Sequence, residues 1–292
     1  MSEVDLHTHS TVSDGSLTPA ELVREAARVG LQALALTDHD TVQGLPEALA
    51  AGRRFGLEVI PGCELAVDVP RGFMHLLGLW LPEEPVRLLE SLAYLQERRR
   101  ARNLEMIAAL KRLNIEIDEQ EVKARAGGGT MGRVHMAMLL VAKQVVPDMQ
   151  QAFAKYIGSQ GKAYVPKDKL LPAEAIRVLK EEGATVILAH PYSLELPRDE
   201  LFTTVADLQA KGLDGLEVFY PEHTPEQTAI FRSLCRTRDL LQSGGSDFHG
   251  LGRPGVRLGR GKGDLDLPYD LLRAMKERRR EQGLWVTSGR DD

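Results

Sequence analysis

The chain has 292 residues, which is enough for one large α/β domain, alone or with an inserted second domain. Hydrophobic residues make up 43% of the sequence and charged residues 27%, so the composition excludes a disordered or fibrous protein. A net charge of −5 argues against a surface built mainly to hold duplex DNA, although a few arginines could still meet one phosphate group.

Cysteine usage and the N-terminus bear on the cellular compartment. Cys63 and Cys235 have no CxxC spacing, so they predict neither a disulfide framework nor a zinc ribbon and fit a reducing compartment. The N-terminal residues lack a basic segment followed by an apolar one, and no later run of about 20 apolar residues could cross a bilayer. We therefore expect a cytoplasmic protein without a membrane partner, and the sequence leaves its oligomeric state open.

Short apolar runs alternate with amphipathic stretches along the first 60 residues. We predict strands at 4–7, 33–36 and 57–60, one helix that Pro19 opens and a second helix near 43–55. Strand and helix in alternation are typical of a mostly parallel sheet or barrel.

The same alternation returns beyond residue 170. Helices are predicted near 172–182, 198–211 and 225–238, and strands within 185–191, 213–220 and 240–249. The alternation on both sides of the middle segment assigns 1–97 and 166–292 to one barrel domain.

The interval 98–165 interrupts this pattern. It begins with a charged helix and continues with helical patterns near 134–146 and 148–157, without a clear buried strand. The glycines at 127–129 favour a hinge between these parts. We interpret 98–165 as a helical insert domain that covers the active site.

Histidines and acidic residues gather where the predicted strands end. The set comprises His7 and His9; Asp38, His39 and Asp40; Glu64; His190; Glu217, which lies within its strand; and Asp247 and His249. The carboxyl ends of parallel barrel strands open onto one face, so these side chains converge there. Since such residues are rarely buried without partners, their convergence predicts a metal cluster rather than packing.

The local spacing fits shared ions. In His7-Thr8-His9 both imidazoles lie on the same side of an extended segment, and Asp247-x-His249 repeats this arrangement. A carboxylate such as Glu64 can bridge two ions. Nitrogen and oxygen ligands without a thiolate favour manganese, iron or zinc over calcium or copper(I).

Six motifs together resemble the polymerase and histidinol phosphatase (PHP) superfamily. They are DLHTHSTVSDG (5–15), LTDHDT (36–41), PGCELA (61–66), HLLG (75–78), AHP (189–191) and GSDFH (245–249). The resemblance covers the chain except 98–165. It implies an α/β fold, a distorted (β/α)7-type barrel, with a centre of two or three divalent metal ions.

The resemblance also implies a ligand set. His7, His9, Glu64 and Asp247 would hold a first ion, Glu64, His75 and His190 a second, and Asp14, His39 and His249 a third. His75, which alone would be typical of a core histidine, thereby becomes a ligand. Asp14 stands where other members carry histidine, which favours manganese, iron or magnesium over zinc.

The insert is similar to that of a narrower branch, the 3′,5′-nucleotide bisphosphate phosphatases and RNase AM. In that branch an Arg-x-His segment of the insert faces the substrate, and here it would be Arg133 and His135, with Val134 where proline is common. Arg133 would neutralise phosphoryl charge, and His135 or His223 would protonate the leaving oxygen. Without the resemblance, Arg133 fits a salt bridge within the insert and His223 a solvated loop.

We therefore predict a metal-dependent phosphoesterase that removes the 3′-phosphate of nucleoside 3′,5′-bisphosphates, trims short RNA from its 5′ end, or does both. Manganese is the favoured ion, with iron, magnesium or zinc as alternatives. A phosphatase of a small metabolite, such as histidinol phosphate, is one alternative; a non-catalytic metal-binding regulatory module is another. An amidohydrolase fits less well, because Glu64 stands at the position of its bridging lysine.

Overall fold

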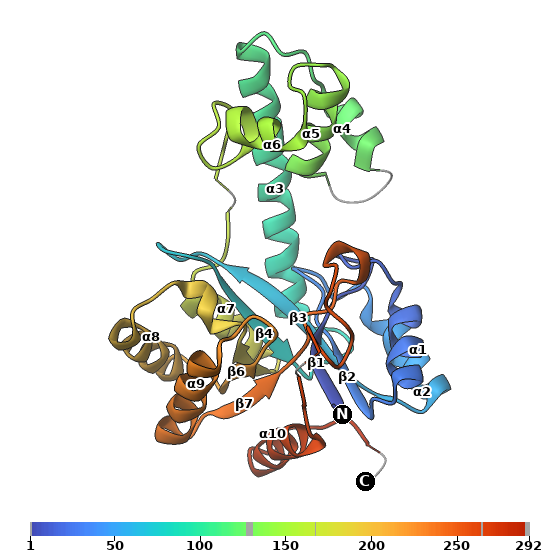
Figure 1. Ribbon diagram of the computed structural model, residues 1–292, viewed down its shortest axis with the longest axis vertical. Coiled ribbons are helices and arrows are strands. Elements are labelled where there is room, and N and C mark those ends of the chain that lie inside the picture. The colour runs from blue at the N-terminus through green and yellow to red at the C-terminus, as the bar shows by residue number, and fades with distance from the viewer. Residues whose placement is uncertain (1, 127–130, 167, 264, 290–292) are drawn as a thin grey trace. The chain divides into compact units, whose positions relative to one another are not determined.

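The computed structural model describes residues 2–126, 131–166, 168–263 and 265–289 (Figure 1). The chain divides into two compact units, residues 1–90 with 170–292 and residues 91–169. The boundaries predicted at 98 and 165 fall a few residues inside the second unit. The predicted glycine hinge at 127–129 lies outside the described residues.

The larger unit is built on seven strands that pair in chain order. They are β1 (Val4–Thr8), β2 (Ala33–Leu36), β3 (Glu58–Val67), β4 (Met74–Leu79), β5 (Thr185–Leu188), β6 (Gly215–Phe219) and β7 (Leu241–Gly244). A bridge between Thr8 and Phe248 links β1 to the segment after β7, so the sheet curves into a nearly closed barrel. The predicted α/β barrel is confirmed.

The strand β4 departs from the parallel arrangement. It pairs antiparallel with both β3 and β5, whereas the other neighbouring strands are parallel. The prediction ended the third strand at residue 60, but β3 continues to Val67, so Glu64 lies within a strand rather than after one. Because β4 runs the other way, its first residues, including His75, lie at the edge where the parallel strands end.

Six helices belong to the larger unit: α1 (Pro19–Val29), α2 (Leu45–Phe55), α7 (Pro172–Glu181), α8 (Arg198–Ala210), α9 (Pro225–Arg238) and α10 (Tyr269–Glu281). They lie around the outside of the sheet (Figure 1). Their starts follow local signals: Thr18 and Thr224 each accept a backbone N–H of the first turn, and a proline follows each. Buried side chains such as Leu6, Ile60 and Trp80 form the core.

The described residues of the second unit form helices joined by turns and loops, without a strand. It holds most of α3 (Val86–Arg112), together with α4 (Glu119–Ala126), α5 (Arg133–Ala142), α6 (Met149–Ala152) and a π-helical turn (Phe153–Ile157). These elements share an apolar core of their own that includes Leu110, Val122 and Met136.

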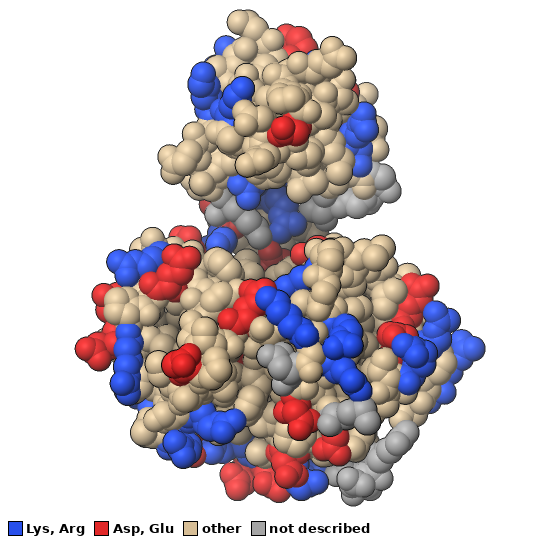
Figure 2. Space-filling view, in the orientation of Figure 1, with Lys and Arg blue, Asp and Glu red and all other residues tan. Residues whose placement is uncertain are grey.

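Basic and acidic side chains are interspersed over the face shown in Figure 2, as the net charge of −5 leads one to expect. Within the described ranges, no helix combines the length and apolar character that crossing a membrane requires.

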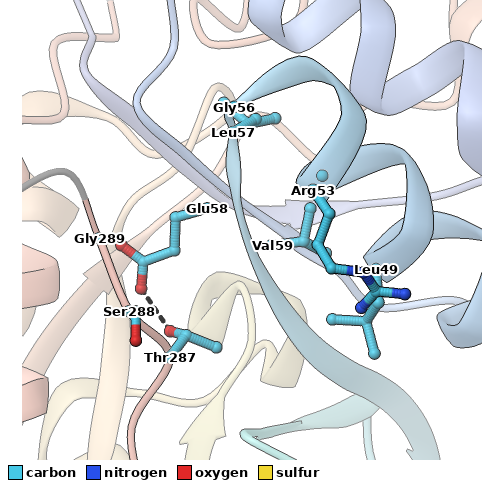
Figure 3. A pocket seen from close by; sticks show the side chains of 10 residues that line it. Leu49, Arg53, Gly56, Leu57, Glu58, Val59, Thr287, Ser288 and Gly289 are labelled. Atoms are coloured by element: carbon cyan, nitrogen blue, oxygen red, sulfur yellow. Dashed lines mark hydrogen bonds between the residues drawn. The ribbon is translucent and has the colours of Figure 1, made fainter.

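A buried ion pair lies at the amino end of β3, beside a pocket that Arg53 and Thr287 help to line (Figure 3). Glu58 and Lys276 approach to 2.9 Å, with side chains only 2% and 3% exposed. We expect Glu58→Gln to lower the free energy of unfolding by about 3–5 kcal/mol, because it removes the charge of a buried carboxylate that pairs with the buried Lys276 ammonium. Urea denaturation measures the change, with Glu277→Gln on the exposed face of α10 as the matched control. Equal stability of the two variants would contradict the prediction.

Candidate metal centre

The structure brings all nine predicted ligands together at one edge of the barrel. Their ligand atoms form four groups, each within 4.8 Å: His7, Glu64 and His190; His7, His9 and Asp247; His39, Glu64 and His75; and His9, Asp14, His39 and His249. Each of the nine belongs to at least one group. Residues that lie up to 242 positions apart, as His7 (7) and His249 (249) do, meet because the strand ends converge.

Glu64 lies at the middle of this cluster and is 1% exposed. Its two carboxylate oxygens face five imidazoles, those of His75 at 2.8 Å, His39 at 2.9 Å, His190 at 3.0 Å, His9 at 3.3 Å and His7 at 3.4 Å. A carboxylate with both oxygens directed at different groups of ligands is suited to bridge two cations.

Several of these buried polar atoms have no hydrogen-bond partner among the described residues. They are Nε2 of His7, both ring nitrogens of His9 and Oε2 of Glu64. Leaving such atoms unsatisfied is costly, and a bound cation would satisfy them. The donors are six imidazoles and three carboxylates without a thiolate, so the residues fit manganese, iron, magnesium or zinc.

Two ligands have a backbone conformation that L-residues seldom adopt. The φ angle is 26° at His190 and 53° at Asp247. Such strained positions persist where surrounding contacts hold them, and they are common at functional sites. Here both strained residues direct side chains into the cluster.

His39 makes the pH dependence of the metal-free protein testable. Burial lowers the pKa of His39, but Glu64 and Asp14 more than offset it and raise the pKa to about 9. A raised histidine pKa stabilises the metal-free fold below about pH 6.5, and this contribution is lost as the pH rises towards 9. Metal binding needs the neutral imidazole, so manganese should bind more tightly as the pH rises over the same range and release protons.

Calorimetric titration with manganese at pH 7, in two buffers of different ionisation enthalpy, counts the released protons. We expect fewer from His39→Gln than from the unaltered protein. Binding without proton release would contradict the expected charge state of the cluster.

A model of the PHP domain matches residues 5–165 of the chain. The chain belongs to the PHP family. A solved structure of a protein described as a metal-dependent phosphoesterase, from Bifidobacterium adolescentis, shares 31% identity and a TM-score of 0.76 with it. The match covers 95% of this chain and 96% of the other.

Three curated relatives of this PHP protein differ in their named substrates. A 3′,5′-nucleoside bisphosphate phosphatase of Chromobacterium violaceum is 33% identical, over 89% of this chain and 91% of its own length. A 5′-3′ exoribonuclease of Haemophilus influenzae is 33% identical over 84% and 89%, and a phosphoribosyl 1,2-cyclic phosphate 1,2-diphosphodiesterase of Eggerthella lenta is 32% identical over 84% and 94%. The predicted enzyme class, a hydrolase of phosphoric ester bonds, is confirmed. The relatives do not single out one of their three substrates for this chain.

Contacts behind two of the candidate ligands set the direction of their rings. Glu217 in β6 lies 3.0 Å from Nδ1 of His7 and accepts the backbone N–H of His190 at 2.7 Å. The Ser193 hydroxyl lies 3.0 Å from Nδ1 of His190. With Nδ1 engaged in each ring, Nε2 is left to face the cluster, as is common around protein metal sites. Asp38 instead accepts hydrogen bonds from Ser10 and Ser13 and so holds the loop before Asp14.

Sequence reasoning missed a group that contacts Asp247 from outside. Oδ2 of Asp247 accepts the Tyr220 hydroxyl at 2.8 Å and pairs with the Arg253 guanidinium. Arg253 also donates to the Tyr220 oxygen at 2.8 Å and pairs with Glu222 at 2.8 Å. The one signal in the sequence was an arginine four residues beyond the last candidate ligand.

Arg133 and His135 belong to the second unit and open α5. The Arg133 guanidinium lies 5.7 Å from the ring centroids of both Phe153 and Tyr164 and donates to the carbonyl of Ile157 at 3.4 Å. In the described parts of the chain no carboxylate pairs with it, so the salt bridge that the sequence also allowed is not found. The roles of Arg133 and His135 towards the substrate stay predictions.

His223 lies on the loop after β6. Its Nδ1 is 3.0 Å from the carbonyl of Val218, which places the proton on Nδ1, while Nε2 is buried without a hydrogen-bond partner among the described atoms. Burial lowers the pKa of His223, so the ring is neutral near pH 7. These features count against proton donation from Nε2 in this conformation, and the predicted acid role is untested.

Proposed function

We propose that this PHP hydrolase acts on nucleotides, removing the 3′-phosphate of nucleoside 3′,5′-bisphosphates, trimming short RNA from its 5′ end, or doing both. The observation that carries the proposal is the cluster around Glu64, with nine candidate ligand residues and buried polar atoms that a cation would satisfy. Relatives named for each of these two activities match over most of their length, which favours nucleotide substrates.

In this proposal the nine candidate ligands hold the ions, and neighbouring side chains orient the ligands or contact the phosphate. His7, His9, Glu64 and Asp247 would hold one ion, Glu64, His75 and His190 a second, and Asp14, His39 and His249 a third. When bound, divalent ions lower the pKa of a water molecule and neutralise phosphoryl oxygens. Glu217 orients His7, and the Arg253–Tyr220 pair holds the outer oxygen of Asp247. Arg133 would add a bidentate contact to the phosphate.

The test is an assay of the manganese-loaded protein against adenosine 3′,5′-bisphosphate and a short 5′-phosphorylated RNA. His190→Ala serves as the control, and released phosphate and nucleoside monophosphates are scored. Release from either substrate that is lost in the variant supports the proposal and ranks the two activities. If neither substrate is hydrolysed while other phosphate esters are, the nucleotide assignment is wrong.

A second candidate is hydrolysis of a five-carbon sugar cyclic phosphodiester, which the Eggerthella lenta relative favours because it matches over 94% of its length. Phosphoribosyl 1,2-cyclic phosphate is therefore a third arm of the assay, and histidinol phosphate a fourth. Full metal loading without turnover of any ester would instead favour a non-catalytic regulatory module.

A further inference from the structure

Phe73 lies between β3 and β4, directly beside the candidate metal centre. Its ring centroid is 5.7 Å from that of His75 and 5.9 Å from that of His190. The side chain is nevertheless 43% exposed. A single exposed apolar residue needs no explanation by itself. Phe73, however, packs against two candidate ligands, and this position suggests a role at the site.

The backbone around Phe73 is held in place. Its N–H donates to the carbonyl of Ser193 at 2.9 Å, and its carbonyl accepts the Ser193 hydroxyl at 2.9 Å. Gly72, at φ +60°, approaches so closely that an added Cβ would lie 2.2 Å from the Ser193 carbonyl oxygen. Because Ser193 also contacts His190, the same contacts orient the ligand and present the aromatic ring.

Other aromatic rings near the centre are engaged elsewhere. The Tyr192 hydroxyl donates to Glu222 at 2.6 Å, and its ring packs against Tyr220 and His223 at centroid distances of 5.6 Å and 5.5 Å. Tyr220 is 6% exposed and bonded to Asp247. Phe73 therefore offers an open aromatic face on a fixed backbone, which a flat ligand can cover with little loss of conformational entropy.

We infer that Phe73 is the platform on which the base of the nucleotide stacks while its phosphate occupies the metal centre. This inference rests on the nucleotide substrate proposed above. Stacking on an aromatic side chain suits every base, since each has a π-face, and it would distinguish nucleoside phosphates from sugar phosphates that lack a base. Phe73 would thus determine the substrate class without touching the reacting bond.

The test compares adenosine 3′,5′-bisphosphate with methyl ribofuranoside 3,5-bisphosphate, which presents the same phosphates without the base. We expect Phe73→Ala to lower kcat/KM for the nucleotide about 5- to 150-fold, the range that alanine substitution of stacked aromatics gives. The value for the abasic compound should stay within about twofold. Phe73→Trp should retain the preference for the nucleotide.

Arg71→Ala is the matched control, because Arg71 lies in the same loop and pairs only loosely with Glu200, at 3.6 Å on the surface. Arg71→Ala should leave kcat/KM unchanged for both substrates. An equal loss on both substrates in Phe73→Ala, or no loss on either, overturns the inference while leaving the nucleotide activity of the unaltered protein in place.

If the unaltered protein hydrolyses no nucleotide, the proposed function is wrong whatever the role of Phe73. The role of Phe73 is then tested by ligand binding instead of by activity. Calorimetry on the manganese-loaded protein then compares AMP with inorganic phosphate. Tighter binding of AMP that is lost in Phe73→Ala supports a base platform. Equal affinity for the two ligands overturns it.

Discussion

Glu64→Gln is expected to abolish most metal binding and to lower phosphoester hydrolysis by more than about 100-fold. Losing an outer-shell contact typically costs about 10–100-fold, and Glu64 lies at the centre of the ligand cluster itself. Five imidazoles have a ring nitrogen within 3.4 Å of its carboxylate oxygens. The glutamine amide keeps the shape but offers one neutral acceptor and two donors where two cations would be bridged.

Elemental analysis of the purified variant gives the metal content, and the nucleotide assay gives the activity. Glu58→Gln is the matched control, since Glu58 is a buried carboxylate at the opposite end of β3. That control should lose stability but keep its metal and its activity. Full metal content in Glu64→Gln would contradict the bridging role.

The barrel could be predicted where local signals determine the structure. The strand at 33–36 and the helix at 225–238 have the predicted bounds. The strand follows from a short apolar run and the helix start from a Thr-Pro pair, and both signals span only a few residues. The helical character of 91–169 also follows from short-range periodicity.

The direction of β4 could not be predicted in this way. It depends on pairing with β3 along Gly62–Val67 and with β5, which is more than 100 residues away. The apolar pattern of HLLGL is the same for either direction, so this pattern alone is typical of a core histidine at His75. Only the reversed strand explains how an imidazole at the start of β4 reaches Glu64.

The contacts behind the candidate ligands were harder still to predict. Tyr220 follows β6, whereas Arg253 lies with Asp247 on the segment after β7, and no sequence motif links the tyrosine to the arginine. Most of the candidate ligands carry a sequence signal because they lie close to the ends of predicted strands, whereas an arginine beside one of them has no such marker. Tertiary contacts of this kind are visible only once the loops are placed.

Removing the Arg253 guanidinium tests its contact with Asp247, which the sequence did not predict. We expect Arg253→Ala to weaken activation by manganese and to lower kcat/KM by about 10–100-fold. Arg253 and Tyr220 hold Oδ2 of Asp247, which leaves Oδ1 facing His9 at 3.2 Å and His7 at 3.5 Å. Without them the carboxylate is free to rotate and to present both oxygens to one ion.

Tyr220→Phe should produce a smaller loss of the same kind, because it removes one of the two contacts to Oδ2. The double variant should lose less than the product of the two single losses, since both contacts hold the same oxygen. Arg257→Ala, an exposed arginine in the same loop, is the matched control and should leave the manganese dependence unchanged. If Arg253→Ala lowered the maximal rate with an unaltered manganese dependence, the guanidinium would act on the substrate instead of positioning Asp247.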